Sequence, residues 1–264
     1  MDRPCYVHIG THKTGTTSLQ SLLALNALEL SFAGLYVPRA GRISPMHAGH
    51  HSIAWELLGT PRSEAYRGML HALTSELHWR GEAAACISSE EFEFLAPLPD
   101  ALERLRSGIR ASGFEPHFVV YLRSQAEYSR SLVAELRKND PELTLEAFCD
   151  GVLEQGEFAG SVLDYHRLLA GFADVVGDDR IIVRRYREHT LDERDLLRDF
   201  LGVVAPRADE TRLTWPERLN AAPPILAPPP LAAATIARFQ ARFGPGNTRV
   251  AERFGVSVPV ACDG

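Results

Sequence analysis

Residues 5–17 read CYVHIGTHKTGTT, an apolar run followed by a loop rich in glycine and threonine. The segment Cys5–Ile9 favours a short buried β-strand, because apolar side chains dominate it and a glycine ends it. Leucines at helical spacing follow, which predicts a helix from Thr16. A loop between a strand and a helix N-terminus directs backbone N–H groups and the helix dipole at an anion. The sequence therefore predicts a phosphate-binding loop at residues 10–17.

The rest of the chain alternates between strand-like and helix-like segments. Strands are expected at Gly34–Pro38, Ala83–Ser88, Phe118–Leu122 and Arg180–Tyr186. Helical spacing is found at Ser52–Leu58, Glu64–Trp79, Ser124–Lys138, Leu143–Leu153, Ser161–Phe172 and Leu191–Leu201. Alternation of this kind predicts an α/β fold of three layers, with a mainly parallel central sheet and helices on both faces.

The C-terminal part of the chain has a different composition. Ala221–Pro230 contains five prolines, which disfavour a helix or a central strand and predict a surface loop or an extended strap. Helical spacing returns in residues 231–255, where the Gly244-Pro245-Gly246 break predicts a helical hairpin. A chain of 264 residues suits one large domain, so we expect a single domain over residues 1–264.

Composition excludes several classes of protein. The net charge of −6 provides no positive field to hold a nucleic acid or an acidic membrane. No segment approaches the roughly 18 apolar residues of a membrane-spanning helix. The four cysteines form no CxxC pair, which suits a reducing compartment. We therefore expect a soluble, cytoplasmic protein without a transmembrane segment.

The position of the lysine limits the kinds of ligand that the loop at residues 10–17 can bind. Gly10 and Gly15 have the GxxxxG spacing of a nucleotide P-loop, but Thr16 stands where the lysine of that motif would follow. The lysine is instead Lys13, inside the loop, where it can reach the bridging oxygen of a group linked to a 5′-phosphate. Thr16 and Thr17 can donate hydrogen bonds to that phosphate. This departure from the nucleotide P-loop motif disfavours a nucleotide kinase or hydrolase, which remains the alternative enzyme class.

A second pair of residues points to another phosphate. Arg123 follows the expected strand Phe118–Leu122, and Ser131 comes eight positions later, two turns into the next helix. The guanidinium by its charge and the hydroxyl by hydrogen bonding can both bind one phosphate.

The two motifs together resemble the sulfotransferase family, whose donor signature runs KTGTT after the first strand, as at residues 13–17 here. The resemblance implies a P-loop NTPase-like fold and the donor 3′-phosphoadenosine 5′-phosphosulfate (PAPS), with Arg123 and Ser131 on its 3′-phosphate. The segment Ile181–Val203 is similar to the family's last strand, turn and helix. The implied donor contacts are His12, Lys13, Thr14, Gly15, Thr16, Thr17, Arg123, Ser131, Arg218 and Asn220. Of these, Arg218 and Asn220 belong to a segment that resembles the loop that covers the adenosine in bacterial members.

The reaction that the resemblance implies needs a base for the acceptor proton, and family members use a glutamate or a histidine. Glu90 ends the apparent strand ACISSE, at the edge where open α/β sheets bind ligands, and is our first choice. The histidines His47, His50 and His51 are the rival bases and, with Ser89, the expected acceptor-binding residues. A zinc site is disfavoured because adjacent histidines diverge and no cysteine or acidic pair completes it. No metal is required.

The sequence thus predicts transfer of a sulfuryl group from PAPS to an acceptor hydroxyl, of a carbohydrate or a small metabolite. A module that binds PAPS or adenosine 3′,5′-bisphosphate without catalysis remains open as a third class. The sequence leaves both the acceptor and the oligomeric state undetermined.

Overall fold

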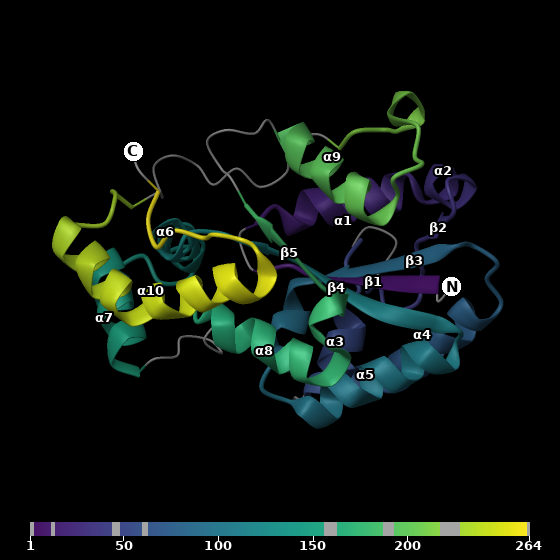
Figure 1. Cartoon of the computed structure of the whole chain (residues 1–264), viewed down its shortest axis with the longest axis horizontal. Helices are drawn as coiled ribbons and strands as arrows, with labels where there is room; N and C mark the ends of the chain where they lie inside the picture. The colour runs from purple at the N-terminus through teal and green to yellow at the C-terminus, as the bar shows by residue number, and fades with distance from the viewer. Residues whose placement is uncertain are drawn as a thin grey trace.

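The computed structural model describes residues 3–11, 14–43, 48–59, 63–155, 163–186, 193–216 and 228–262. Its centre is a five-stranded sheet in the order β2-β3-β1-β4-β5, in which all neighbouring strands are parallel (Figure 1). The strands are β1 (Arg3–Ile9), β2 (Leu35–Tyr36), β3 (Ala84–Ser89), β4 (Phe114–Leu122) and β5 (Ile181–Arg185). The predicted parallel α/β architecture is confirmed.

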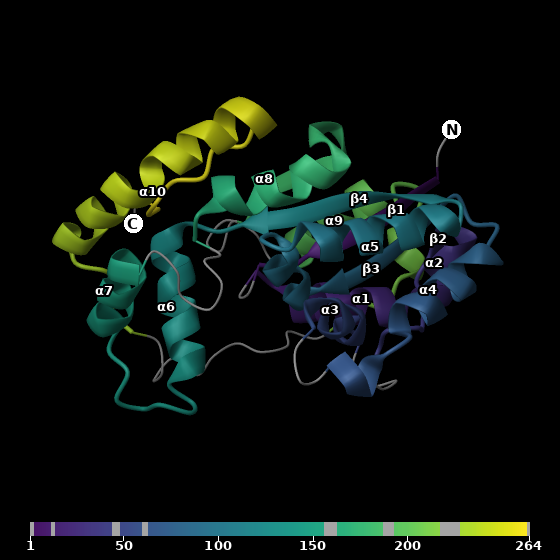
Figure 2. The ribbon, with the colours of Figure 1, turned by 90° about the horizontal axis from the view of Figure 1, so that it is seen from below.

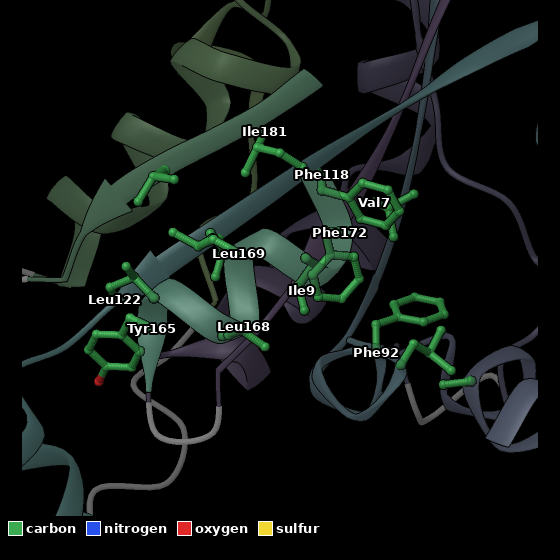
Figure 3. Close-up of a cluster of buried hydrophobic side chains, with 14 of the residues drawn as sticks. Val7, Ile9, Phe92, Phe118, Leu122, Tyr165, Leu168, Leu169, Phe172 and Ile181 are labelled. Carbon is green, nitrogen blue, oxygen red and sulfur yellow. The ribbon is translucent and has the colours of Figure 1, made fainter. Parts of the chain in front are cut away.

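Helices cover both faces of this sheet, as Figure 1 shows. One face carries α1 (Thr16–Leu25) and α9 (Glu193–Val204), whose leucines and Phe200 pack on β1 and β4. The other face carries α3 (His51–Leu58), α5 (Pro99–Ala111) and α8 (Tyr165–Val176). The larger core lies on this second face, where Phe118 of β4 meets Phe172 of α8 with ring centroids 4.8 Å apart (Figure 3). The remaining α-helices are α2 (Ala27–Phe32), α4 (Met69–His78), α6 (Gln125–Leu136), α7 (Leu145–Gln155) and α10 (Ala233–Phe254).

The register of the central strands places three chain segments at one edge of the sheet. The last residue of β1, Ile9, is paired with Ser89 at the end of β3 and with Val120 near the end of β4. The chain leaves β1 toward β2 on one side and later returns to form β4 on the other side. This reversal of direction is where open α/β sheets bind their ligands.

The C-terminal helix corrects one expectation from the sequence. Instead of a hairpin, α10 is one continuous helix that runs through Pro245. Phe239, Phe243 and Val250 lie on one buried face at helical spacing, on both sides of the proline. Burial of this continuous stripe outweighs the one hydrogen bond that proline cannot donate.

The segment Glu64–Trp79 also differs from the expected single helix. It consists of a 3₁₀ turn, η1 (Ser63–Tyr66), followed by α4, and Gly68 between them has φ of 92°. That left-handed conformation interrupts a right-handed helix. The helices α2 and α5 were not predicted from the sequence. The helix α5 has a strongly one-sided pattern, with Ala101, Leu102, Leu105 and Ile109 buried.

The helices α6, α7 and α10 group at the end of the molecule opposite to α4 (Figure 2). Polar as well as apolar contacts join these helices and the C-terminal segment to one another. Gln125 of α6 and Asn247 of α10 exchange two amide hydrogen bonds, of 2.9 and 3.0 Å. The backbone N–H of Ala126 donates to the carbonyl of Val260 at 2.9 Å. The C-terminal segment thereby holds the first turn of the helix that follows β4.

Two buried histidines make the fold sensitive to acid. Burial lowers the pKa of His8 to about 3 and that of His50 to about 4. Below pH ~6.5 the unfolded chain protonates both histidines while the folded chain does not, so the free energy of unfolding falls as the pH decreases. Each histidine should contribute a slope of about 1.4 kcal/mol per pH unit between about pH 6 and 5. Urea unfolding at several pH values measures this slope.

The variant His8→Asn isolates one contribution. His8 Nδ1 lies 2.8 Å from Ser88 Oγ, and asparagine retains a polar group on that side while removing the titration. For this variant, the slope of the free energy of unfolding against pH should be smaller by about 1.4 kcal/mol per pH unit than for the wild type. An unchanged slope would mean that His8 is protonated in the folded state.

Candidate active site

The loop after β1 is closed by its own threonines. Thr11 Oγ1 donates to the carbonyl of Tyr121 in β4 at 2.8 Å, and Thr14 Oγ1 donates to the carbonyl of Thr11 at 2.6 Å. Both side chains are fully buried. The hydroxyl of Thr14, which the resemblance assigned to the donor, is therefore used inside the loop. Its hydrogen bond helps to set the loop's shape.

The start of α1 has the features of an anion site. Gly15, with φ of 76°, precedes the helix, and no acidic residue lies in the first turn. Thr16 is buried, and its Oγ1 has no hydrogen-bond partner in the described part of the chain. A buried hydroxyl without a partner is costly, and an anion at the positive end of the helix would satisfy it. Thr17 is exposed at the same end.

Gly10 leaves the space that this hydroxyl occupies. A Cβ at residue 10 would lie 2.3 Å from Thr16 Oγ1 and 2.8 Å from its Cγ2. A side chain there would push Thr16 out of place. This close approach explains the glycine at the end of β1 without any need for an unusual backbone conformation.

Arg123 lies at the end of β4 and is only 5% exposed. Its carbonyl accepts a hydrogen bond from Tyr165 Oη at 2.5 Å, and its guanidinium lies over the ring of Tyr186, 5.5 Å from the centroid. A guanidinium held in this way is a positive charge in a largely desolvated position. Ser131 is half-buried on α6, seven residues after Ser124 at the N-cap and so on the same side of the helix.

Glu90 starts the short 3₁₀ helix η2 (Glu90–Leu95) directly after β3. Its side chain is 25% exposed, and its Oε2 accepts a hydrogen bond from Gln20 Nε2 at 2.9 Å. His51 Nδ1 lies 3.8 Å from the same oxygen and 2.8 Å from Ser89 Oγ. The structure thus brings Glu90, His51 and Ser89 together at the end of β3. Ser89 Oγ also accepts from the N–H of Glu91 at 3.1 Å and so caps η2.

Gln20 was missed by the sequence analysis. It lies on α1, 70 positions before its partner Glu90, and is 5% exposed. A buried glutamine among leucines was the available signal, since a buried amide needs hydrogen-bond partners. Its partner could be identified only from the packing of α1 beside β3.

The role expected for His50 is corrected by the structure. His50 is fully buried; its Nδ1 accepts from the N–H of Ser88 at 3.1 Å, and its Nε2 lies 3.0 Å from the carbonyl of Pro38. Both ring nitrogens are used by the backbone, and burial lowers the pKa to about 4. His50 is a neutral structural residue that joins β3 to the segment after β2, and it is available neither as a base nor as an acceptor contact.

Five other residues assigned from the sequence, His12, Lys13, His47, Arg218 and Asn220, lie outside the described residues. Among the residues that the structure describes, no group of three or more histidine, cysteine or acidic side chains could hold a metal ion. Within the same part of the chain, no helix is long and apolar enough to cross a membrane.

Comparison with known proteins identifies the architecture. No protein-family model matches the chain. No curated protein matches it in sequence. Among solved structures it is similar to a sulfotransferase from Alicyclobacillus acidocaldarius, with a TM-score of 0.59, 16% identity and 98% of each chain covered. The chain has the sulfotransferase fold. This sulfotransferase fold extends over nearly the whole chain, and the predicted fold class is confirmed.

The variant Gly10→Ala tests the shape of the loop in this sulfotransferase fold. Because the added Cβ would displace the Thr16 hydroxyl, we expect the affinity for adenosine 3′,5′-bisphosphate, the ligand that the resemblance implies, to fall by about tenfold or more, with the fold retained. Isothermal titration calorimetry measures the affinity. Gly202→Ala on α9 is the control, because a Cβ there meets nothing within 4 Å. Equal affinities of the two variants would contradict the loop geometry.

Proposed function

We propose that this protein is a PAPS-dependent sulfotransferase that transfers a sulfuryl group to an acceptor hydroxyl. One observation carries the proposal. The parallel sheet brings three features to the same edge: the Thr16 hydroxyl at a helix N-terminus, which has no partner among the described residues, the buried Arg123, and the hydrogen-bonded carboxylate of Glu90. An anionic donor with two phosphates and an acceptor that must lose a proton require such an arrangement.

In this proposal the donor binds along the ends of β1 and β4. The N–H groups of Gly15, Thr16 and Thr17 and the Thr16 hydroxyl bind the 5′-phosphate, while Thr14 holds the loop closed. Lys13 stabilises the charge that develops on this phosphate as it leaves. Arg123 and Ser131 bind the 3′-phosphate. His12, Arg218 and Asn220 complete the contacts with the donor.

The chemical step needs only groups of this chain and the two substrates. The acceptor oxygen attacks the sulfur in line with the bond to the bridging phosphate oxygen, and that bond breaks with its electron pair going to the phosphate. The proton of the acceptor hydroxyl goes to the carboxylate of Glu90. The sulfuryl group carries less charge than a phosphoryl group, so a lysine suffices where kinases use Mg²⁺.

The acceptor in this proposal is a carbohydrate or a small metabolite. His51, Ser89 and His47 line its pocket beside Glu90. The ring of Trp55 stacks on that of His51 with centroids 5.8 Å apart, and Tyr66 continues the row at 5.2 Å from Trp55. This half-buried row of rings starts at His51, beside the proposed base. It supports an acceptor with an apolar ring face, as sugars and phenols have.

We also propose a cytoplasmic location. The four cysteines are free, and three of them, Cys5, Cys86 and Cys149, are buried. Burial raises the pKa of the Cys5 and Cys149 thiols to about 12, which suits unreactive core residues.

Donor binding can be tested without knowing the acceptor. Calorimetric titration should show metal-independent binding of adenosine 3′,5′-bisphosphate in preference to ATP. Arg123→Ala should weaken this binding by at least about tenfold, because a buried guanidinium would be lost from the 3′-phosphate. Arg238→Ala, which removes an exposed arginine paired with Asp150, is the control and should have no effect. Binding of ATP with Mg²⁺ instead, or of neither ligand, would reject the proposal.

The role of Glu90 is tested by Glu90→Gln, which retains the shape of the side chain and removes the basic oxygen. Turnover of PAPS, measured as sulfate transferred to a panel of hydroxylated acceptors and to water, should fall by about a hundredfold or more. The affinity for adenosine 3′,5′-bisphosphate should stay within about twofold of the wild type. Full activity in this variant, with loss of activity in His51→Ala, would move the base to His51. Donor binding without any transfer by the wild type would favour a binding module.

A further inference from the structure

We infer that Gln20 is a positioning residue that fixes the carboxylate of Glu90 from the helix that follows the donor loop. The inference rests on the proposed function, because it gives Glu90 the role of base. It concerns a residue that neither the sequence motifs nor the comparisons assign.

The hydrogen bond of Gln20 distinguishes the two oxygens of the carboxylate. Gln20 Nε2 donates to Oε2 at 2.9 Å, and His51 Nδ1 lies near the same oxygen at 3.8 Å. Within the described part of the chain, no hydrogen bond reaches Oε1. One oxygen is therefore anchored, and the other is left to accept a proton from a substrate. A fixed carboxylate oxygen aligns that proton transfer better than a rotating one.

The position of Gln20 on α1 links the base to the donor loop. Gln20 comes four residues after Thr16 and three after Thr17, so these residues lie on neighbouring positions of one helix face. Gln20 is 5% exposed and Thr16 is 6% exposed, so both are held by packing. One turn of a rigid helix, about 5.4 Å, separates the residue that holds the base from the residue at the anion site. The helix that starts at the donor loop thus also sets the carboxylate.

Gly49 provides the space for this arrangement. A Cβ at residue 49 would lie 2.3 Å from His51 Nε2 and 2.8 Å from Gln20 Oε1. The amide oxygen of Gln20 therefore faces Gly49 while its NH₂ group faces Glu90, which is the only orientation in which the amide can donate to a carboxylate. His51 cannot easily move away, because it is stacked on Trp55 and bonded to Ser89.

The chemistry of the hydrogen bond gives a readout beyond stability. A hydrogen-bond donor to a carboxylate favours its ionised form, so removal of that hydrogen bond makes the carboxylate easier to protonate. The acidic limb of the pH–rate profile should then move to higher pH. A nearby cation should move it to lower pH. The other titratable groups placed near Glu90 among the described residues are His51 from α3 and, on η2 itself, Glu91 and Glu93.

The experiment measures the slow hydrolysis of PAPS to sulfate, with water as the acceptor, as a function of pH. Gln20→Met retains the side-chain volume without a donor, and Gln20→Lys retains a donor and adds a charge. We expect Gln20→Met to lower the maximal rate by about ten- to a hundredfold, as for loss of one hydrogen bond to a charged group, and to move the acidic limb to higher pH. Gln20→Lys should move the limb in the opposite direction. Gly49→Ala should resemble Gln20→Met.

Two controls separate the possible failures. Ser112→Ala removes a buried hydrogen bond of 2.6 Å at the other end of the sheet and should leave the profile in place. Calorimetric titration with adenosine 3′,5′-bisphosphate should give the Gln20 variants an affinity within about twofold of the wild type. Wild-type rate and pH profile in Gln20→Met would overturn the inference while leaving the proposed function intact. Absence of donor binding by the wild type would instead reject the proposed function.

Discussion

The parallel pairing of β1 with both β3 and β4 is the constraint on which the candidate site depends. Parallel strands end at the same edge, so the register that pairs Ile9 with Ser89 and Val120 also brings together the segments that follow each strand. These segments carry the proposed donor loop, Glu90 and Arg123. They are separated by tens of residues along the chain, and only the hydrogen-bonded ladders of the sheet make them neighbours.

The protein stabilises each polar group at this edge in a different way. The backbone around Arg123 is held by Tyr165, and Tyr186 covers its charge. Glu90 is partly exposed and accepts a hydrogen bond from Gln20. Thr16 Oγ1 has no partner among the described residues, and the anion of the proposed donor would supply one. The loop itself is held by Thr11 and Thr14, whose hydroxyl groups bond to the backbone. Among the described residues, contacts within the protein thus hold most polar groups of the candidate site in place, and fixed groups of this kind would reduce the cost of orienting the proposed substrates.

The C-terminal part of the chain supports this edge from outside. The helix α10 and the segment after it bind the first turn of α6 through Asn247 and the carbonyl of Val260. Arg130 of α6 donates to the carbonyl of Pro228, at the end of the proline-rich stretch. The backbone just after Arg123 is therefore fixed by residues more than a hundred positions away. Core packing around Phe239, Phe243 and Val250 provides the stability for these polar contacts.

Local patterns in the sequence were enough to predict the strand–loop–helix at residues 5–17, the parallel sheet, and the candidate residues that follow the central strands. These features depend on local periodicity and on glycine, which act over a few residues and can be read directly. The tertiary structure decided the rest. It showed that α10 continues through Pro245, because burial of a long apolar stripe outweighs a local break. It showed that His51 lies beside Glu90, whereas both ring nitrogens of its neighbour His50 form contacts with the backbone. It also paired Gln20 with Glu90, since a hydrogen bond between residues 70 positions apart depends on how α1 packs beside β3, and no local pattern encodes that distance.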